Sequence, residues 1–296
     1  MSLRRLLVVD PDPAVHELLA AALKSDDCSI LDVLDEKEAV KSLRQTPCDV
    51  LVAGPGRNGF DALKLLRQVR TLAPEARVIL TGDPDPKRVI GAIRQHAYCY
   101  FRAPLSPGPL TDMVQQALGT PSWKDDIRLI SARPEWVALD VRCKLEAAER
   151  TTQFVREIEG DLPPVVREDV AAAFRELLMN AVEHGGRGDP KKRVRVSLVR
   201  TSRSLIVHIH DPGAGFSLDF LPHAAISNPV DAPIRHVEVR AEEGRRPGGF
   251  GILLTRNLVD ELIYNERGNA VLFVKYLDRD HAQVTAEGIP REGAGQ

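Results

Sequence analysis

The sequence lacks the features that mark membrane, nucleic-acid-binding and disulfide-rich proteins. No apolar run approaches the roughly 20 residues that span a bilayer, and the first ten residues lead into an acidic turn rather than a cleavage site. A formal net charge of −2 argues against a general nucleic-acid-binding surface. We therefore expect a cytoplasmic protein with neither a membrane nor a nucleic acid as a partner.

Cysteine is also too scattered to build a site. The four cysteines form no C-x-x-C pair and have no nearby histidine cluster: Cys28, Cys48, Cys99 and Cys143. This spacing suggests neither a metal site nor a disulfide framework. With 296 residues, 43% hydrophobic and 28% charged, the chain instead has the composition of a soluble globular protein long enough for two domains.

Residues 1–119 alternate short apolar runs with amphipathic stretches. Strands are expected at Leu6–Asp10, Ser29–Val33, Val50–Ala53, Val78–Thr81 and Tyr98–Phe101. Helices are expected at Ala14–Lys24, Glu36–Gln45, Phe60–Arg70, Pro86–Gln95 and Pro107–Leu118. This alternation predicts an α/β, flavodoxin-like fold with a five-stranded parallel sheet covered on both faces.

A second domain is expected over residues 136–277, after a linker at 120–135 that opens with a Gly-Thr-Pro-Ser turn. Its expected strands are Trp136–Val141, Val194–Arg200, Leu205–His210 and Ala270–Leu277. Its expected helices are Lys144–Glu159, a second helix between Pro164 and Gly185, and Ile252–Ile263. Residues 216–248 have little periodicity and are expected to form a lid, and 278–296 a flexible tail. The pattern predicts an α+β sandwich.

The second helix of this domain carries a polar pair. A spacing of four residues puts Glu176 and Asn180 on one face, roughly opposite an apolar cluster that includes Val170, Phe174 and Leu177. The Asn180 amide oxygen suits Mg²⁺, and the Glu176 carboxylate suits a base. Many polar stripes on helices are only solvated, so the pair alone is weak evidence of a site.

Two glycine-rich turns come after the polar pair in the chain. Asp211 ends an expected strand, and Gly213 and Gly215 after it let a flat ring approach the backbone. Gly249 and Gly251 directly precede a helix, where backbone N–H groups form a phosphate cradle. Each turn alone is an ordinary sequence, but together with the helix they predict an ATP site.

The order and spacing of these three motifs resemble the GHKL (Bergerat-fold) ATPases over about residues 137–277. Within that superfamily, Asn180 to Gly185 and the later Leu258 to Glu261 look most like the anti-sigma-factor serine kinases (RsbW-like group). The resemblance implies that Asn180 holds Mg²⁺, that Asp211 binds the adenine amine, and that Glu176 activates an acceptor hydroxyl. It also implies that the four glycines of the two turns line the nucleotide: Gly213, Gly215, Gly249 and Gly251. A threonine that the family often places near the adenine is missing at Asn269–Ala270.

A cation near the γ-phosphate is also expected, because phosphoryl transfer depends on charge neutralisation. Arg245 and Arg246 are the candidates, and Arg246 directly precedes the second turn's Pro-Gly-Gly. Adjacent arginines in a loop are often only solvated. His184 has two interpretations: it approaches the phosphates, or it only ends its helix favourably.

The acceptor of the phosphoryl group is expected outside this chain. A self-contained histidine kinase needs a histidine ahead of its ATP domain, and none lies between His96 and His184. By resemblance, we expect a serine/threonine kinase acting on a STAS-type anti-anti-sigma partner, with a sigma factor as a possible competing ligand. The main alternative is a non-enzymatic, ATP-gated binding module. A weaker alternative is a two-component response regulator with ATPase output.

Residues 3–118 resemble a response-regulator receiver domain, with Asp10, Thr81 and Pro104 at receiver positions. The phospho-accepting aspartate would fall at Gly54, and the lysine before the proline at Ala103, although Arg102 lies beside it. Asp49 is the other possible acceptor, but it starts its strand. We therefore predict a pseudo-receiver that docks a partner or dimerises through Pro86–Leu118, and we expect a homodimer.

Overall fold

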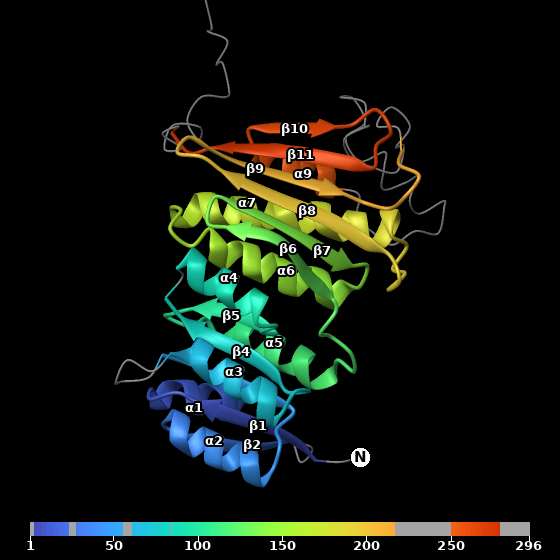
Figure 1. Ribbon diagram of the computed structural model, residues 1–296. Coiled ribbons are helices and arrows are strands. Elements are labelled where there is room, and N and C mark those ends of the chain that lie inside the picture. Colours follow the sequence, from blue (N-terminus) through green and yellow to red (C-terminus); the bar gives the residue numbers. More distant parts are fainter. Residues whose placement is uncertain (1–2, 24–27, 56–60, 84, 217–249, 279–296) are drawn as a thin grey trace, which may run out of the picture.

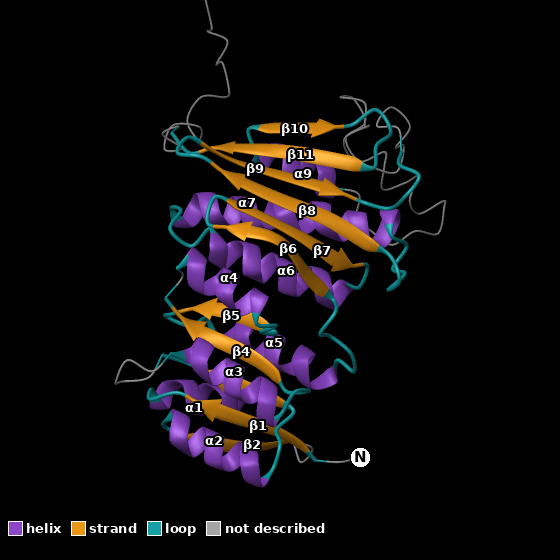
Figure 2. Cartoon of the chain, viewed as in Figure 1, coloured by secondary structure: helices purple, strands orange, loops and turns teal. Residues whose placement is uncertain are grey.

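The N-terminal domain is a five-stranded parallel sheet with helices on both faces (Figures 1 and 2). The computed structural model describes residues 3–23, 28–55, 61–83, 85–216 and 250–278. Strand order is β2-β1-β3-β4-β5. The strands are β1 (Arg4–Val9), β2 (Cys28–Val33), β3 (Val50–Ala53), β4 (Arg77–Gly82) and β5 (Cys99–Arg102). The helices are α1 (Pro13–Ala22), α2 (Glu36–Gln45), α3 (Ala62–Leu72), α4 (Pro86–Arg94) and α5 (Pro107–Gly119). The flavodoxin-like prediction is confirmed.

Aspartates set where most of these helices begin. In each of α1 to α4 the N-cap carboxylate accepts a hydrogen bond from a backbone N–H of the first turn: Asp12, Asp35, Asp61 and Asp85. Such a bond satisfies a donor that the helix itself leaves without a partner. The central strands β3 and β4 are buried at every position, as expected for a parallel sheet covered on both faces.

The C-terminal domain is a six-stranded antiparallel sheet with helices on one face (Figure 1). Strand order is β10-β11-β9-β8-β7-β6. The strands are β6 (Ile127–Arg133), β7 (Trp136–Arg142), β8 (Arg193–Arg200), β9 (Ser204–His210), β10 (Glu261–Tyr264) and β11 (Ala270–Tyr276). The helices are α6 (Leu145–Ile158), α7 (Pro164–Asn180) and α9 (Gly251–Leu258). The α+β prediction is confirmed.

Two elements differ from the sequence-based expectation. β6 lies inside the segment expected to be a linker, and a bulge between Leu129 and Ser131 interrupts the period-two pattern that would have revealed it. The expected helix Ile252–Ile263 ends at Leu258, and β10 comes next. In β10, Leu262 and Tyr264 pack on the core from a strand paired with β11, so the apolar spacing that predicted a helix as far as Ile263 was misleading beyond Leu258.

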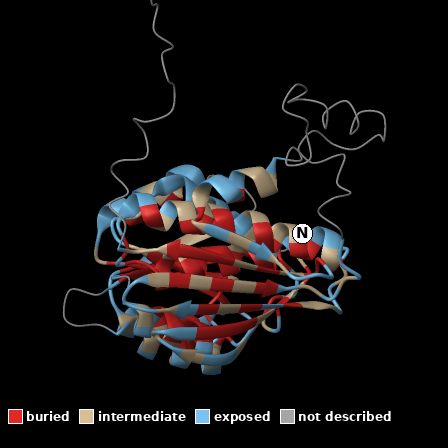
Figure 3. Ribbon diagram, turned by 90° about the horizontal axis from the view of Figure 1, so that it is seen from above, coloured by how far each residue is buried: buried red, intermediate tan, exposed pale blue. Residues whose placement is uncertain are grey.

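The two domains share one continuous apolar core, with α4 and β5 packed against α6. Figure 3 shows buried residues concentrated on the strands and on the helix faces turned toward them. Arg150 of α6 is 2% exposed and donates to the Tyr98 backbone oxygen at 2.9 Å. Its guanidinium lies 4.1 Å from the Tyr98 ring centroid and 3.3 Å from the Asp126 carboxylate. Part of the segment Pro86–Leu118, which was predicted to bind a partner or a second copy, is therefore already in contact with α6 of the C-terminal domain.

No helix among the described residues combines the length and apolar character needed to cross a membrane.

Candidate functional site

Helix α7 brings Glu176 and Asn180 to one side of the C-terminal domain. Val170, Phe174 and Leu177 on its other side are at most 2% exposed and anchor the helix on the sheet. The Glu176 side chain stays 32% exposed, with Arg175 Nη1 at 3.7 Å from its Oε1. Arg175 is itself bound to Glu149. The expected arrangement of an anchored face and an accessible polar face is therefore present.

A π-helical turn, Ala181–Gly185, continues α7 directly after Asn180. The Gly186 N–H donates to the Ala181 oxygen at 2.8 Å, five residues back. Such wide turns inside helices are rare and often occur at functional sites. Here the turn carries Gly185 against Asp211: a Cβ at position 185 would lie 2.2 Å from the Asp211 carboxylate.

Asp211 lies at the end of β9, as predicted, with its carboxylate directed at the first glycine turn. Oδ1 accepts the Gly213 N–H at 2.7 Å. Partial burial raises the pKa of Asp211 above its usual value, and the Gly213 bond opposes that rise. The carboxylate is thus held in place by the backbone of its own turn.

Gly215 has a conformation and a packing that only glycine tolerates. Its φ is +86°, and a Cβ there would lie 1.8 Å from the Arg267 oxygen in the turn between β10 and β11. The first glycine turn therefore packs backbone to backbone on that second turn. Phe216 continues the contact, since its ring meets Tyr264 edge to face at 5.4 Å.

Gly251, at the start of α9, lies against the polar pair on α7. A Cβ at this position would be 2.6 Å from Glu176 Oε2 and 3.7 Å from Asn180 Nδ2. The Thr255 hydroxyl donates to the Gly251 oxygen at 2.9 Å and holds the first turn of α9. Helix α7 and the first residue of α9 thus meet without an intervening side chain.

These parts enclose one cavity of about 560 Å³, within the size range of small-molecule sites. Seven of the predicted site residues line it: Glu176, Asn180, His184, Asp211, Gly213, Gly215 and Gly251. Gly249, Arg245 and Arg246 lie outside the described residues, as does most of the expected lid. The structure brings together every predicted site residue that it describes.

Several lining residues were not predicted. Lys192 and Arg187 add positive charge to the cavity, and Tyr264 adds an aromatic wall. Asn269, where the expected threonine is missing, is 6% exposed and lines the cavity close to Asp211. Its backbone oxygen accepts the Asp211 N–H at 2.9 Å. The basic pair Lys191-Lys192 ahead of β8 was the available signal for the added charge.

In the N-terminal domain, the position of a phospho-acceptor is filled by another side chain. A Cβ at Gly54 would lie 1.7 Å from Asp10 Oδ2 and 3.1 Å from Thr81 Oγ1. Asp49 lies at the opposite end of β3, where its Oδ2 accepts the Arg5 N–H at 2.8 Å. Asp49 is therefore remote from the position at which receivers are phosphorylated.

Comparison with known families agrees with this geometry. Residues 141–275 match the family model for a histidine kinase-like ATPase domain, and residues 6–115 match that for a response regulator receiver domain. The chain joins a receiver domain to a histidine kinase-like ATPase domain. The cavity lies in the ATPase domain, and Gly54 lies in the receiver domain.

Two curated relatives are named as response regulators. The DNA-binding response regulator MtrA of Mycolicibacterium smegmatis is 28% identical over 118 residues, which cover 39% of this chain and 50% of the relative. The response regulator protein PilR of Pseudomonas aeruginosa is 27% identical over 121 residues, which cover 40% of this chain and 27% of the relative. The chain thus spans half or less of the length of these relatives.

Solved receiver domains are similar at low identity. That of NtrX from Brucella abortus is 24% identical, with a TM-score of 0.35, over 39% of this chain and 98% of that one. The receiver domain of an HD domain-containing protein from Pseudomonas fluorescens is 23% identical, with a TM-score of 0.37, over 40% of this chain and 88% of that one.

Proposed function

We propose that the ATPase domain binds Mg·ATP and phosphorylates a serine or threonine on a STAS-type anti-anti-sigma partner. The observation that carries the proposal is the convergence on one cavity of Asp211, Asn180 and Glu176, with Gly251 directly against Glu176. The match to a histidine kinase-like ATPase domain supports the nucleotide. The partner class, and a competing sigma factor, rest on the resemblance to the anti-sigma-factor kinases.

The residues present fit a magnesium nucleotide. Asp211 offers a carboxylate to an exocyclic amine from a turn whose glycines leave room for a flat ring. The Asn180 amide oxygen would hold Mg²⁺, and Lys192 and Arg187 add positive charge to the same cavity. A bound Mg²⁺ would neutralise phosphate charge and orient the phosphates.

Glu176 is assigned as the general base. Its carboxylate takes the proton from the acceptor hydroxyl as the acceptor oxygen forms a bond to the γ-phosphorus. The bond from that phosphorus to the β,γ-bridging oxygen breaks, and ADP leaves with the bonding electron pair. The partial exposure of Glu176 and its position on the cavity wall support this role. If Glu176 only forms an ion pair with Arg175, its role is structural and not catalytic.

A non-enzymatic ATP-gated binding module is the second candidate. The sites assigned to adenine and Mg²⁺, at Asp211 and Asn180, do not depend on Glu176, so the cavity would bind nucleotide in either case. The module would grip a regulator without transferring phosphate. Only the kinase requires the Glu176 carboxylate.

The deciding experiment uses labelled ATP, Mg²⁺ and a STAS-domain protein encoded nearby, scored for phosphoserine or phosphothreonine. Glu176→Gln is expected to abolish labelling while leaving ATP affinity within a few-fold of that of the unaltered protein. Glu168→Gln, an exposed glutamate on the same helix, is the matched control and is expected to keep both. ATP binding without labelling of several such partners supports the module instead.

The receiver domain is proposed to act without phosphorylation, because Gly54 replaces the acceptor. Response regulation with ATPase output, the weaker alternative, requires an acyl phosphate on this domain. Incubation with labelled acetyl phosphate tests it, and label on any aspartate of residues 6–115 would support that alternative.

A further inference from the structure

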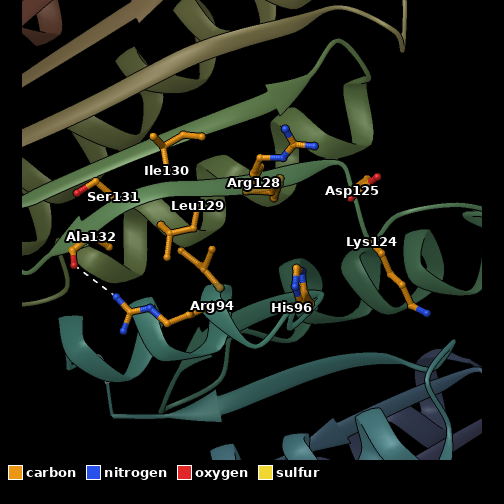
Figure 4. Close-up of a pocket in the computed structure, with 11 residues that line it drawn as sticks. Arg94, His96, Lys124, Asp125, Arg128, Leu129, Ile130, Ser131 and Ala132 are labelled. Atoms are coloured by element: carbon orange, nitrogen blue, oxygen red, sulfur yellow. Dashed lines mark hydrogen bonds between the residues drawn. The ribbon is translucent and has the colours of Figure 1, made fainter.

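Helix α4 and strand β5 of the receiver domain pack on α6 of the ATPase domain, and grooves remain beside this contact. One groove of about 340 Å³ lies between α4 and β6, where Arg94 donates to the Ala132 backbone oxygen at 3.4 Å (Figure 4). In that view Arg128 points away from α4, while Lys124 points in another direction. Because these cations do not converge, this groove indicates no ligand.

A second groove lies between α5 of the receiver domain and helices α6 and α7 of the ATPase domain, and we call it the α5–α6 groove. Its volume is about 270 Å³. Its lining includes the apolar side chains of Phe101 and Met113, which are 4% and 8% exposed. Enclosed small-molecule sites are larger, at roughly 300–1,000 Å³, so this groove suits a few residues of an extended chain.

The α5–α6 groove reaches the neighbour of the proposed base. Arg175 of α7 lines the groove, and its Nη1 lies 3.7 Å from Glu176 Oε1. The other oxygen of that carboxylate, Oε2, lies 2.6 Å from the place of a Cβ on Gly251, in the nucleotide cavity. Arg175 is also bound to Glu149 of α6, which lines the groove as well. Glu176 therefore stands between the nucleotide cavity and the groove, where the acceptor hydroxyl of the proposed reaction would lie.

Two buried polar atoms of residues that line the groove have no hydrogen-bond partner among the described residues. Gln116 Oε1 on α5 is an acceptor, and Arg156 Nε on α6 is a donor. Buried polar groups are normally hydrogen-bonded, so an acceptor and a donor left open in one groove indicate a ligand that offers both kinds of partner. The backbone of an extended peptide does so, because each residue other than proline carries one N–H and one C=O.

Asp112 gives the groove a charge preference. It lies one helical turn before Gln116 on α5, so the two side chains share a face of the helix. Asp112 is exposed and has no ion pair within the part of the chain that the structure describes. The two arginines that line the groove are each paired with a glutamate. The charge left to balance is therefore negative, and a peptide side chain beside Asp112 is expected to be basic.

We propose that the α5–α6 groove binds the segment of the protein substrate that flanks the acceptor serine or threonine. Glu149 and Arg156 lie about two turns apart on α6, or roughly 11 Å, which an extended chain covers in about three residues. The substrate therefore carries an apolar and a basic residue, side by side, about three to five positions from the acceptor. This inference rests on the proposed kinase function. It gives the receiver domain, which lacks its phospho-acceptor, a part in the choice of substrate.

Phosphotransfer from labelled ATP to fluorescent serine peptides tests this recognition in the full-length chain. Two peptides carry a Leu-Arg pair about four residues before or after a single serine in an alanine background. One of them should be labelled at least roughly fivefold faster than its counterpart with glutamate in place of arginine, which sets like charges opposite each other. Asp112→Lys should reverse this preference. Glu17→Lys, at an exposed position on α1 outside the groove lining, is the matched control and should keep it.

Fluorescence anisotropy of the same peptides without ATP measures binding separately from phosphotransfer. Gln116→Leu and Arg156→Lys each remove one partner of the peptide backbone. Each should weaken binding of both peptides by at least roughly threefold without changing the preference for arginine over glutamate. Arg156→Lys keeps a positive charge beside Glu168, which lies 3.1 Å from Arg156 Nη2. Circular dichroism and ATP affinity verify that each variant is folded.

The two readouts distinguish failure of the groove from failure of the kinase. Peptide binding that depends on Asp112, without any labelling, would support the groove and count against the kinase. Labelling that is indifferent to arginine and glutamate, and unchanged in Asp112→Lys, would overturn the groove and leave the kinase in place. No binding of either peptide at millimolar concentration would also overturn the groove, and the kinase is then judged on the intact STAS-domain protein.

Discussion

The carboxylate of Asp10 occupies the space that a side chain at position 54 would need. Asp10 is 4% exposed, and its Oδ1 accepts the Asp12 N–H at 2.9 Å. A Cβ added to Gly54 would lie 1.7 Å from the other carboxylate oxygen of Asp10. Burial raises the pKa of Asp10 above its usual value. The loss of the receiver's acceptor has therefore been accommodated by packing rather than left as a gap.

Gly54→Ala should destabilise the receiver domain, because the buried Asp10 side chain must move to admit a methyl group. Overpacking of this kind costs about 1–3 kcal/mol, measurable as a lower urea midpoint. Gly119→Ala is the control, since a Cβ there meets nothing within 4 Å. A Gly54→Ala variant as stable as the control would show that Asp10 is not fixed. Gly54→Asp should likewise be destabilised and take no label from acetyl phosphate.

Stability should fall as the pH rises from about 4.5 to about 7. Burial raises the pKa of Glu157 from its usual 4.5 to about 7. The folded protein therefore holds a proton in that window that the unfolded chain has released, and ionisation at higher pH costs stability. Glu159 is expected to act in the same direction, because burial raises its pKa to about 7.

Glu157→Gln should flatten this pH dependence. Arg102 of the receiver lies 3.3 Å from Glu157 Oε2, Gln153 donates to Oε1 at 2.7 Å, and Arg156 is also near. Thermal unfolding between pH 5 and pH 8 measures the slope, with Glu17→Gln, at an exposed position on α1, as the control. If Glu157→Gln leaves the slope of stability against pH unchanged, the Glu157 carboxyl is not a cause of the pH dependence.

Gly251→Ala should impair phosphotransfer more than nucleotide binding. The new Cβ would press on Glu176 Oε2, which lies 2.6 Å from the position it would take. The carboxylate sits at the end of a flexible side chain and can move, so stability should change little. Single-turnover transfer and ATP affinity should be measured side by side, with Gly108→Ala, which meets nothing within 4 Å, as the control. Equal losses of both would argue against an effect through Glu176.

The sequence predicted the elements whose periodicity was clear. β3 and α2 have the expected bounds, and the spacing of Glu176 and Asn180 placed both on the cavity wall. β6 was missed because its bulge breaks the alternation of apolar and polar residues. β10 was missed because Leu262 follows Leu254 and Leu258 at spacings of four residues and so continues the apolar face of α9. The position of Lys192 in the cavity wall could not be predicted from the sequence, because it depends on the fold, which brings the start of β8 to the π-helical turn. No local pattern could show that Arg150 would be buried against Tyr98 of the other domain.

Calorimetric titration with ATP and Mg²⁺ shows directly whether Asp211 and its neighbours form a Mg·ATP site. We expect binding by the unaltered protein and a loss of at least roughly tenfold in Asp211→Ala, because hydrogen bonds to charged groups contribute about 1.5–3 kcal/mol. Affinity should also fall at low pH, since the raised pKa of Asp211 makes its carboxylate easier to protonate. Asp189→Ala, in a turn outside the cavity lining, should bind like the unaltered protein. No binding at millimolar ATP, or equal binding by Asp211→Ala, would contradict the assignment of this cavity to the nucleotide.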